Sequence, residues 1–117
     1  MATWRLHINF KDDEIDIINA DTDETVNDLA VEPGDALEFK CEDHGWGIQF
    51  IGEGSPDTPG RQPPPLDSMS VNGESGHSDT ITVDRNALRG KQWDYVAAVV
   101  HDNKVYTRDP DIRIKER

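Results

Sequence analysis

The sequence predicts an all-β protein, built as an antiparallel two-sheet sandwich of seven to eight short strands. Apolar and polar residues alternate in several segments, most clearly from Trp4 to Phe10 and from Trp93 to Val99. This alternation is typical of a strand that buries one face. Turn residues such as Pro33-Gly34 separate the segments. No segment keeps a helical periodicity, so no layer of helices is expected.

The candidate strands follow one another along the whole chain. Asp12-Asp13 and residues 101–104 are expected to form tight turns between them. Ile112 and Ile114 share one face of the last strand, and we expect that strand to complete a sheet edge. The candidate strands are residues 4–10, 14–19, 29–31, 37–41, 46–50, 69–71, 79–83, 93–99, 105–106 and 112–114.

The length predicts one domain that spans residues 1–117, because a chain of 117 residues is long enough for a single hydrophobic core. One segment departs from the strand pattern. Residues 52–67 are rich in Pro, Gly and Ser and include Pro63-Pro64-Pro65, so we expect a long loop there. Loops of this length are often functional.

The charge of the chain excludes several kinds of partner. Asp and Glu number 24 against 12 Lys and Arg, which gives a net charge of −12. A surface of this charge repels phosphate backbones, so a nucleic-acid partner is not expected. No apolar run approaches the roughly 20 residues of a membrane span, so we expect no membrane contact. The first residues lack the pattern of a signal peptide, which favours a cytoplasmic location.

Two separated segments together resemble the cupredoxin family. The turn and strand from Gly34-Asp35 to Phe39, followed by a loop and a further strand, are similar to the first half of a cupredoxin. The late strand from Tyr95 and the closing segment 109–114 are similar to its second half. The resemblance implies a Greek-key sandwich, and it extends to small bacterial and archaeal cupredoxin-like domains that lack copper.

The copper ligands that the resemblance would imply are missing. The position of the first histidine falls at Trp46 or Gly47, and that of the cysteine falls near Val99. His101 lies close to the position of the second histidine, and no methionine follows it. A blue-copper site requires a cysteine thiolate. We therefore expect a scaffold without a blue-copper centre, and no cofactor.

A different metal site is the alternative. Cys41 and His44 have a spacing that could hold zinc or copper, with help from Asp43 and from a distant His77 or His101. The second pair of ligands that a structural zinc site needs is missing from the pattern. The favoured interpretation is a buried, inert Cys41 beside an exposed loop histidine.

No catalytic pattern is present. Residues 75–79 contain Ser, His and Asp, but adjacent residues seldom converge into a triad. Residues 21–32 have part of the spacing of a calcium loop, but Val26 stands where the sharp turn needs glycine. Phosphate-binding, dinucleotide-binding and zinc-protease motifs are absent from the sequence. We therefore expect a protein that is not an enzyme.

These exclusions favour a non-catalytic binding or protein-interaction module with a protein as its partner. The predicted binding surface combines the turn at residues 43–47 with the loop at residues 52–67. Its candidate contact residues are His44, Trp46 and Arg61. Trp46 follows a flexible turn, and aromatic residues are common at interaction hot spots. Core packing of Trp46 and a solvated Arg61 are the alternatives.

Overall fold

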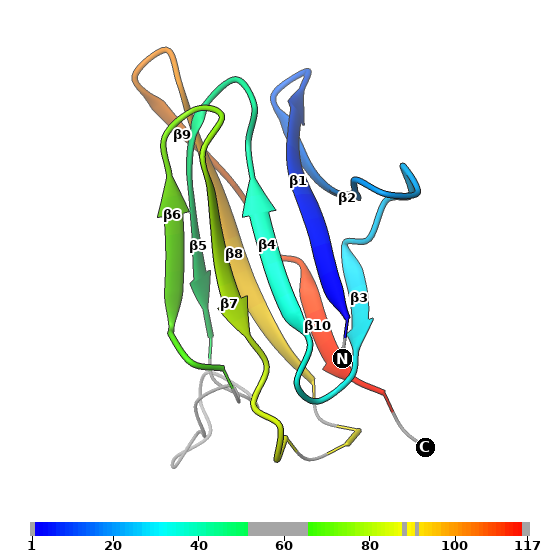
Figure 1. Cartoon of the computed structure of the whole chain (residues 1–117). Coiled ribbons are helices and arrows are strands. Elements are labelled where there is room, and N and C mark those ends of the chain that lie inside the picture. Colours follow the sequence, from blue (N-terminus) through cyan, green and yellow to red (C-terminus); the bar gives the residue numbers. More distant parts are fainter. Residues whose placement is uncertain (1, 52–65, 88, 91, 116–117) are drawn as a thin grey trace.

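The structure is a computed structural model that describes residues 2–51, 66–87, 89–90 and 92–115. All regular secondary structure in these residues is β-strand, and the strands form two layers (Figure 1). The predicted all-β sandwich is confirmed. The ten strands of the described residues are β1 (Thr3–Lys11), β2 (Glu14–Asn19), β3 (Asp28–Val31), β4 (Ala36–Lys40), β5 (Gly45–Phe50), β6 (Ser70–Gly73), β7 (Ser78–Thr82), β8 (Gln92–His101), β9 (Lys104–Arg108) and β10 (Asp111–Ile114).

The chain passes several times between the two layers. The first sheet has the strand order β2-β1-β4-β7. The second sheet has the order β3-β10-β8-β5-β6, and β9 also pairs with β8. Sequence neighbours therefore often lie in different sheets, as β3 and β4 do, and sheet neighbours such as β1 and β4 are distant in sequence.

Three details differ from the expectations of the sequence. The described residues contain ten strands, one for each candidate segment, rather than the seven to eight expected for the sandwich, and β3, β6 and β10 have only four residues each. The sheets are mixed rather than purely antiparallel, because β1 pairs in parallel with β4 and β3 with β10. The strand β10 lies between β3 and β8, and is an interior strand rather than an edge.

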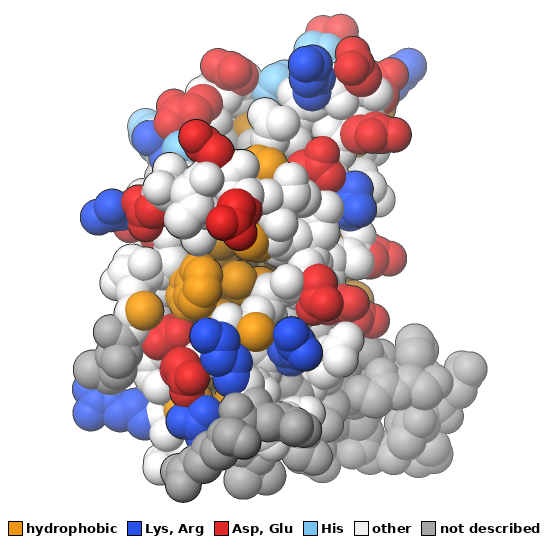
Figure 2. Space-filling view, turned by 90° about the vertical axis from the view of Figure 1, so that its right-hand side faces the viewer, with side chains coloured by type: hydrophobic (Ala, Val, Ile, Leu, Met, Phe, Trp, Pro, Cys, Tyr) orange, Lys and Arg blue, Asp and Glu red, His pale blue; other side chains and the backbone are white. Residues whose placement is uncertain are grey.

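The core lies between the sheets and contains the inward side chain of every second strand residue. At its centre, Phe39 of the first sheet packs against Phe50 and Tyr95 of the second, with ring centroids 6.3 and 5.8 Å apart. All three side chains are almost fully buried. Among the described residues, the charged side chains other than Asp35 remain outside. Figure 2, which views the side of the molecule formed by β2 and β3, shows mostly polar and charged atoms around a small hydrophobic area.

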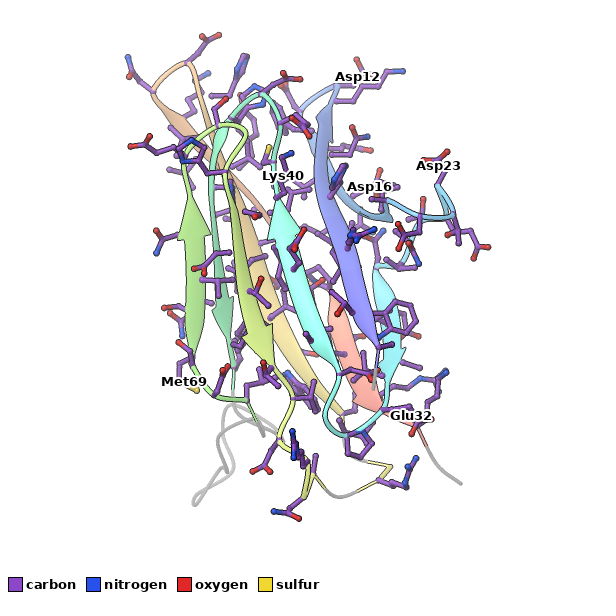
Figure 3. The ribbon with its side chains drawn as sticks, in the orientation of Figure 1. Asp12, Asp16, Asp23, Glu32, Lys40 and Met69 are labelled. Carbon is purple, nitrogen blue, oxygen red and sulfur yellow. The ribbon has the colours of Figure 1, made fainter. Side chains whose placement is uncertain are left out.

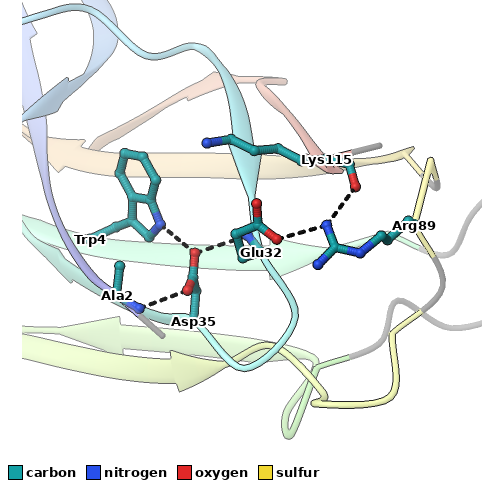
Figure 4. Close-up of polar contacts among 6 residues, drawn as sticks. All are labelled: Ala2, Trp4, Glu32, Asp35, Arg89 and Lys115. Carbon is teal, nitrogen blue, oxygen red and sulfur yellow. Dashed lines mark hydrogen bonds and ion pairs between the residues drawn. The ribbon is translucent and has the colours of Figure 1, made fainter. Parts of the chain in front are cut away.

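One buried carboxylate joins three segments at the lower end of the sandwich. Asp35 is only 1% exposed. It accepts hydrogen bonds from the Ala2 amide at 2.8 Å, the Trp4 indole at 2.9 Å and the Glu32 amide at 2.9 Å (Figure 4). Gly34, at φ 87°, provides the left-handed residue that the turn needs. Asp35 thereby connects the start of β1, the end of β3 and the turn into β4.

These hydrogen bonds set the ionisation of Asp35. Burial by itself raises the pKa of this carboxyl, but the donors from Glu32, Trp4 and Ala2 favour the charged form and bring the pKa below its usual value of 3.8. The folded state therefore binds this proton less tightly than the unfolded state does. The stabilisation is present above pH 3.8 and is lost as the pH falls through the folded-state pKa.

We expect Asp35→Asn to lower the free energy of unfolding by about 1.5–3 kcal/mol at neutral pH, because buried N–H donors lose a charged acceptor. The difference between wild type and variant should shrink in acid, where the wild-type carboxyl also becomes neutral. Urea denaturation at neutral and acidic pH measures both quantities. Asp12→Asn, in an exposed turn, is the control and should change little. Equal stability of Asp35→Asn and wild type at neutral pH would contradict this role.

A row of three aspartates crosses the outer face of the second sheet. The register places Asp111 of β10 opposite Asp28 of β3 on one side and opposite Asp94 of β8 on the other. A hydrogen bond with Asp94, burial and the charges of Asp94 and Asp28 raise the pKa of Asp111 to about 6. Like charges directly opposite each other destabilise a sheet, so this row opposes folding when all three carboxylates are ionised.

Asp111→Asn should therefore stabilise the protein at pH 8 by about 1 kcal/mol, a value that allows for solvent screening of the pKa shift. The stability that protonated Asp111 contributes is complete below pH 3.8 and is lost as the pH rises through about 6. The gain from the substitution should consequently vanish in acid. Thermal unfolding of both proteins across this pH range measures the effect. A variant that is less stable than wild type at pH 8 would show that the row is not repulsive.

Candidate functional site

The turns at residues 12–13, 41–44, 74–77 and 102–103 meet at the upper end of the sandwich in Figure 1. We call this region the histidine end. Two of the turns are two-residue hairpin loops in which both residues have positive φ: Asp12 and Asp13 join β1 to β2, and Asp102 and Asn103 join β8 to β9. Asp and Asn tolerate this conformation, which explains why these residues form tight turns.

At the histidine end, β1 runs beyond the strand that pairs with it. The last pairing of β1 with β4 is His7 opposite Lys40. After Lys40, the last residue of β4, the chain turns away from β1 toward the second sheet. It is held there by the β6–β7 turn, where the Gly76 amide donates to the Cys41 carbonyl at 2.7 Å and the Ser75 hydroxyl donates to the Glu42 carbonyl at 3.0 Å.

This divergence leaves backbone groups of β1 without a strand partner. The Ala20 amide donates to the Arg5 carbonyl, so the backbone groups of Arg5 and of every second residue after it face β2. The carbonyl of Ile8 and the amide and carbonyl of Phe10 face the opposite side. No strand of the described residues pairs with them there. We call these three groups the open edge of β1.

A groove of about 290 Å³ lies beside the open edge. Its lining includes Ile8 and Phe10 on one side and residues 41–44 on the other. The Ile8 side chain is only 3% exposed, so Ile8 contributes mainly backbone to the groove. An unpaired strand edge next to a groove is a known template for the addition of another strand.

Acidic side chains surround this groove. Asp23, Glu42 and Asp43 are exposed and belong to its lining. The Lys40 ammonium, 2.9 Å from the Glu42 carboxylate, lowers the pKa of Glu42, so that carboxylate is ionised at neutral pH. In Figure 3, Asp23 points outward from the loop after β2, and Lys40 lies at the upper end of β4. The groove therefore favours positively charged groups.

Two histidines lie in direct contact at the same end. His44 Nε2 is 3.1 Å from His101 Nδ1, and His101 Nε2 is 3.3 Å from the Asp102 carboxylate. The tautomers of the two rings set which nitrogen donates in the contact between His44 Nε2 and His101 Nδ1. The Phe10 ring packs against both imidazoles, with centroids 5.2 and 5.5 Å away.

Cys41 begins the turn that ends at His44, but it is buried. Its side chain is 2% exposed, and burial raises the pKa of the thiol. The backbone amides of Asp43 and His44 donate to the sulfur and oppose this shift only in part. Cys41 therefore stays a neutral thiol within the 41–44 turn. Among the residues that the structure describes, no three His, Cys, Asp or Glu side chains are grouped so as to hold a metal ion.

The other predicted contact residues lie elsewhere. Trp46 is 5% exposed and its indole donates to the His77 carbonyl at 3.0 Å. Trp46 is therefore a core side chain, which is the alternative that the sequence left open. The close approach of Gly73 gives the indole room, because a Cβ at that glycine would lie 2.7 Å from the indole nitrogen. Arg61, and most of the expected loop at 52–67, lie outside the described residues.

The sequence pattern pointed to His44, and to His101 as an additional metal ligand from a distant segment. It did not point to Phe10 or to the open edge of β1. The available signal was a difference in length, since the alternation continues through Phe10 in the first strand and stops near Cys41 in its later partner. That signal becomes useful only when the two strands are known to pair in parallel from a common starting level.

No protein-family model matches this chain, and no curated protein is significantly similar to it. In the described part of the chain, there is no helix with the length and apolar character needed to cross a membrane. The site is therefore interpreted from the residues of this chain alone.

Proposed function

We propose that this protein is a non-catalytic protein-binding module that takes an extended segment of its partner along the open edge of β1. The single observation that supports this proposal is the divergence of β4 from β1, which leaves the Ile8 carbonyl and both Phe10 backbone groups facing a groove. An added strand would continue the line of β4 and satisfy these groups with main-chain hydrogen bonds.

The charges around the groove define the partner segment. Asp23, Glu42 and Asp43 border it, and the whole chain carries a net charge of −12. An extended segment with basic residues on its exposed side complements this border, and the field of the protein speeds its approach. The groove offers no activated nucleophile, because the Cys41 thiol is buried and its pKa is raised.

The scaffold is part of the proposal. We infer a cupredoxin-like Greek-key domain without a blue-copper centre, and the support is the two-sheet sandwich together with the Pro33-Gly34 turn and the late aromatic strand β8. A cytoplasmic location is also proposed. The only cysteine, Cys41, is a buried free thiol and forms no disulfide, which is compatible with a reducing compartment.

The test is a fluorescence-anisotropy titration with a labelled peptide of alternating lysine and valine. We expect binding, and we expect Asp43→Lys to weaken it by about fivefold or more, which corresponds to about 1 kcal/mol. Asp94→Lys makes the same charge change on the second sheet and is the matched control. The same peptide with its central amides N-methylated should not bind, because it cannot donate to the edge of a strand.

Two outcomes would contradict the proposal. Equal weakening by Asp43→Lys and Asp94→Lys would show that the peptide is attracted by the total charge rather than held at the groove. Unchanged binding of the N-methylated peptide would show that strand addition is not involved.

A second candidate function is transition-metal binding by His44 and His101. The observation that favours it is the 3.1 Å separation of His44 Nε2 and His101 Nδ1. If an ion bonded to both nitrogens at about 2.05 Å, the N–ion–N angle would be about 100°, which is close to the tetrahedral angle. Asp102 holds His101 by its other nitrogen, as carboxylates behind metal-binding histidines commonly do. The alternative expected from the sequence was a site of Cys41 and His44, and this candidate keeps His44 and adds His101.

Isothermal titration with Zn²⁺ and Cu²⁺ tests this candidate. We expect a dissociation constant of about 1–100 μM, because only two protein ligands are available and water must supply the others. His44→Ala and His101→Ala should each abolish the binding, whereas His77→Ala should not change it. Cu²⁺ should produce no intense thiolate band, since Cys41 is a buried thiol. Binding that survives His101→Ala would exclude this pair as the site.

A further inference from the structure

A cavity of about 500 Å³ lies on the outer face of the second sheet, at the lower end of β3 and β10 in Figure 1. The strand register forms its floor, because Arg113 of β10 lies opposite Ala30 of β3 on one side and opposite Gln92 of β8 on the other. Gly90 and residues 114–115 complete the described lining. We call this hollow the basic cavity.

The backbone around the basic cavity is held by hydrogen bonds. The Lys115 amide donates to the Val31 carbonyl at 2.9 Å, so the pairing with β3 continues to this residue. Lys115 therefore follows Arg113 on the same face, since alternate residues of a strand point to the same side. The Gly90 amide donates to the Ile114 carbonyl at 2.9 Å and fixes the adjoining turn. Two long basic side chains thus border one hollow, and Ala30 has only a methyl group to fill it.

The local charge is opposite to that of the whole chain. Of the six described residues that line the cavity, two are basic and none is acidic, although the chain has 24 acidic residues against 12 basic ones. A third cation lies beside them, because the Arg89 guanidinium donates to the Lys115 carbonyl at 3.2 Å (Figure 4). Arg89 is paired with Glu32 at 2.7 Å. Within the described residues, no carboxylate forms an ion pair with Arg113 or Lys115, so both charges are available to a ligand.

The surrounding charges favour a small anion over a large one. A polyanion would extend beyond the cavity, over the neighbouring row of Asp28, Asp111 and Asp94 and over the rest of a chain with a net charge of −12. That surface would repel it. A small anion contacts only the cavity, where charge-assisted hydrogen bonds act at short range and salt screens the more distant repulsion. The volume of the cavity is also in the range of small-molecule sites.

We propose that the basic cavity binds a small molecule that carries a phosphate monoester group. The two charges of Arg113 and Lys115 match the nearly two negative charges of such a group at neutral pH, whereas a single carboxylate would leave one cation unmatched. The planar guanidinium can donate two parallel hydrogen bonds to two phosphate oxygens, and the ammonium adds a point charge. The remainder of the ligand would lie over Ala30 and beside the Gln92 amide, which can both donate and accept. This site is separate from the groove at the histidine end and does not depend on it.

A titration of the full chain with glucose 6-phosphate, followed by the NMR shifts of the backbone amides, tests the proposal. We expect saturable shifts at the cavity residues, with a dissociation constant of about 0.1–5 mM. Arg113→Gln and Lys115→Gln should each weaken binding by about fivefold or more. Arg5→Gln removes the same charge from the outer face of the first sheet and is the matched control, which should change the affinity little. Glucose, which lacks the phosphate, should produce no shifts.

Two further variants separate the cavity from a general effect of charge. Ala30→Leu fills the hollow without changing any charge and should weaken the binding of glucose 6-phosphate. Asp111→Asn removes a carboxylate from the neighbouring row and should strengthen binding by about twofold, because less negative charge then opposes the phosphate. Asp12→Asn makes the same change in a turn at the histidine end and should have little effect. Thermal unfolding shows whether each variant is folded.

Simple anions identify the group that is recognised. Inorganic phosphate should shift the same amides as glucose 6-phosphate, and acetate should bind more weakly than either, because it carries one charge. Three results would overturn the proposal: no shifts with glucose 6-phosphate up to about 20 mM, equal weakening by Arg113→Gln and Arg5→Gln, or binding of acetate that is as strong as that of phosphate. A preference for an acidic peptide over glucose 6-phosphate would also overturn it, and would assign the cavity to a protein partner.

Discussion

Asp35 brings three segments together, and their arrangement determines the shape of the opposite end of the molecule. Its carboxylate accepts from the Ala2 amide and the Trp4 indole, and thereby sets the start of β1 against the turn that begins β4. The two strands consequently start at the same level, with Thr3 opposite Ala36. Because β1 has nine residues and β4 has five, β1 extends beyond the end of β4. The groove at the histidine end is the consequence of a hydrogen-bonded turn at the other end.

Charge is distributed unevenly over the two sheets. The chain has 24 acidic residues, and some of them oppose folding, as the row of Asp28, Asp111 and Asp94 does. Others surround the groove, where they prefer a basic ligand. The outward residues Gly47 and Gln49 of β5, and Asn72 and Ser70 of β6, carry no charge. Net charge alone therefore describes this surface poorly, since different areas of the same acidic protein suit different partners.

The histidine pair depends on two hairpin-like connections that the sequence places far apart. His44 ends the turn before β5, and His101 is the last residue of β8, 57 positions later. The antiparallel pairing of β5 with β8 brings the two ends together, and Phe10 of the other sheet packs against both rings. The pair therefore links the two layers at the histidine end, in addition to any ligand that it holds.

Most strands and their buried faces could be predicted from the sequence, because the alternation of side chains is a local property of an extended chain. The alternation from Trp93 to Val99 is one example, and the tight turn at Asp12-Asp13 is another. The neighbours of each strand could not be predicted in this way. The parallel pairing of β1 with β4, the interior position of β10 and the contact of His44 with His101 depend on how the chain crosses between sheets. Trp46 shows the same limit, because its burial depends on Gly73 and the His77 carbonyl of another hairpin. Local alternation specifies which side of a strand is buried, whereas only the tertiary structure decides what lies beside it.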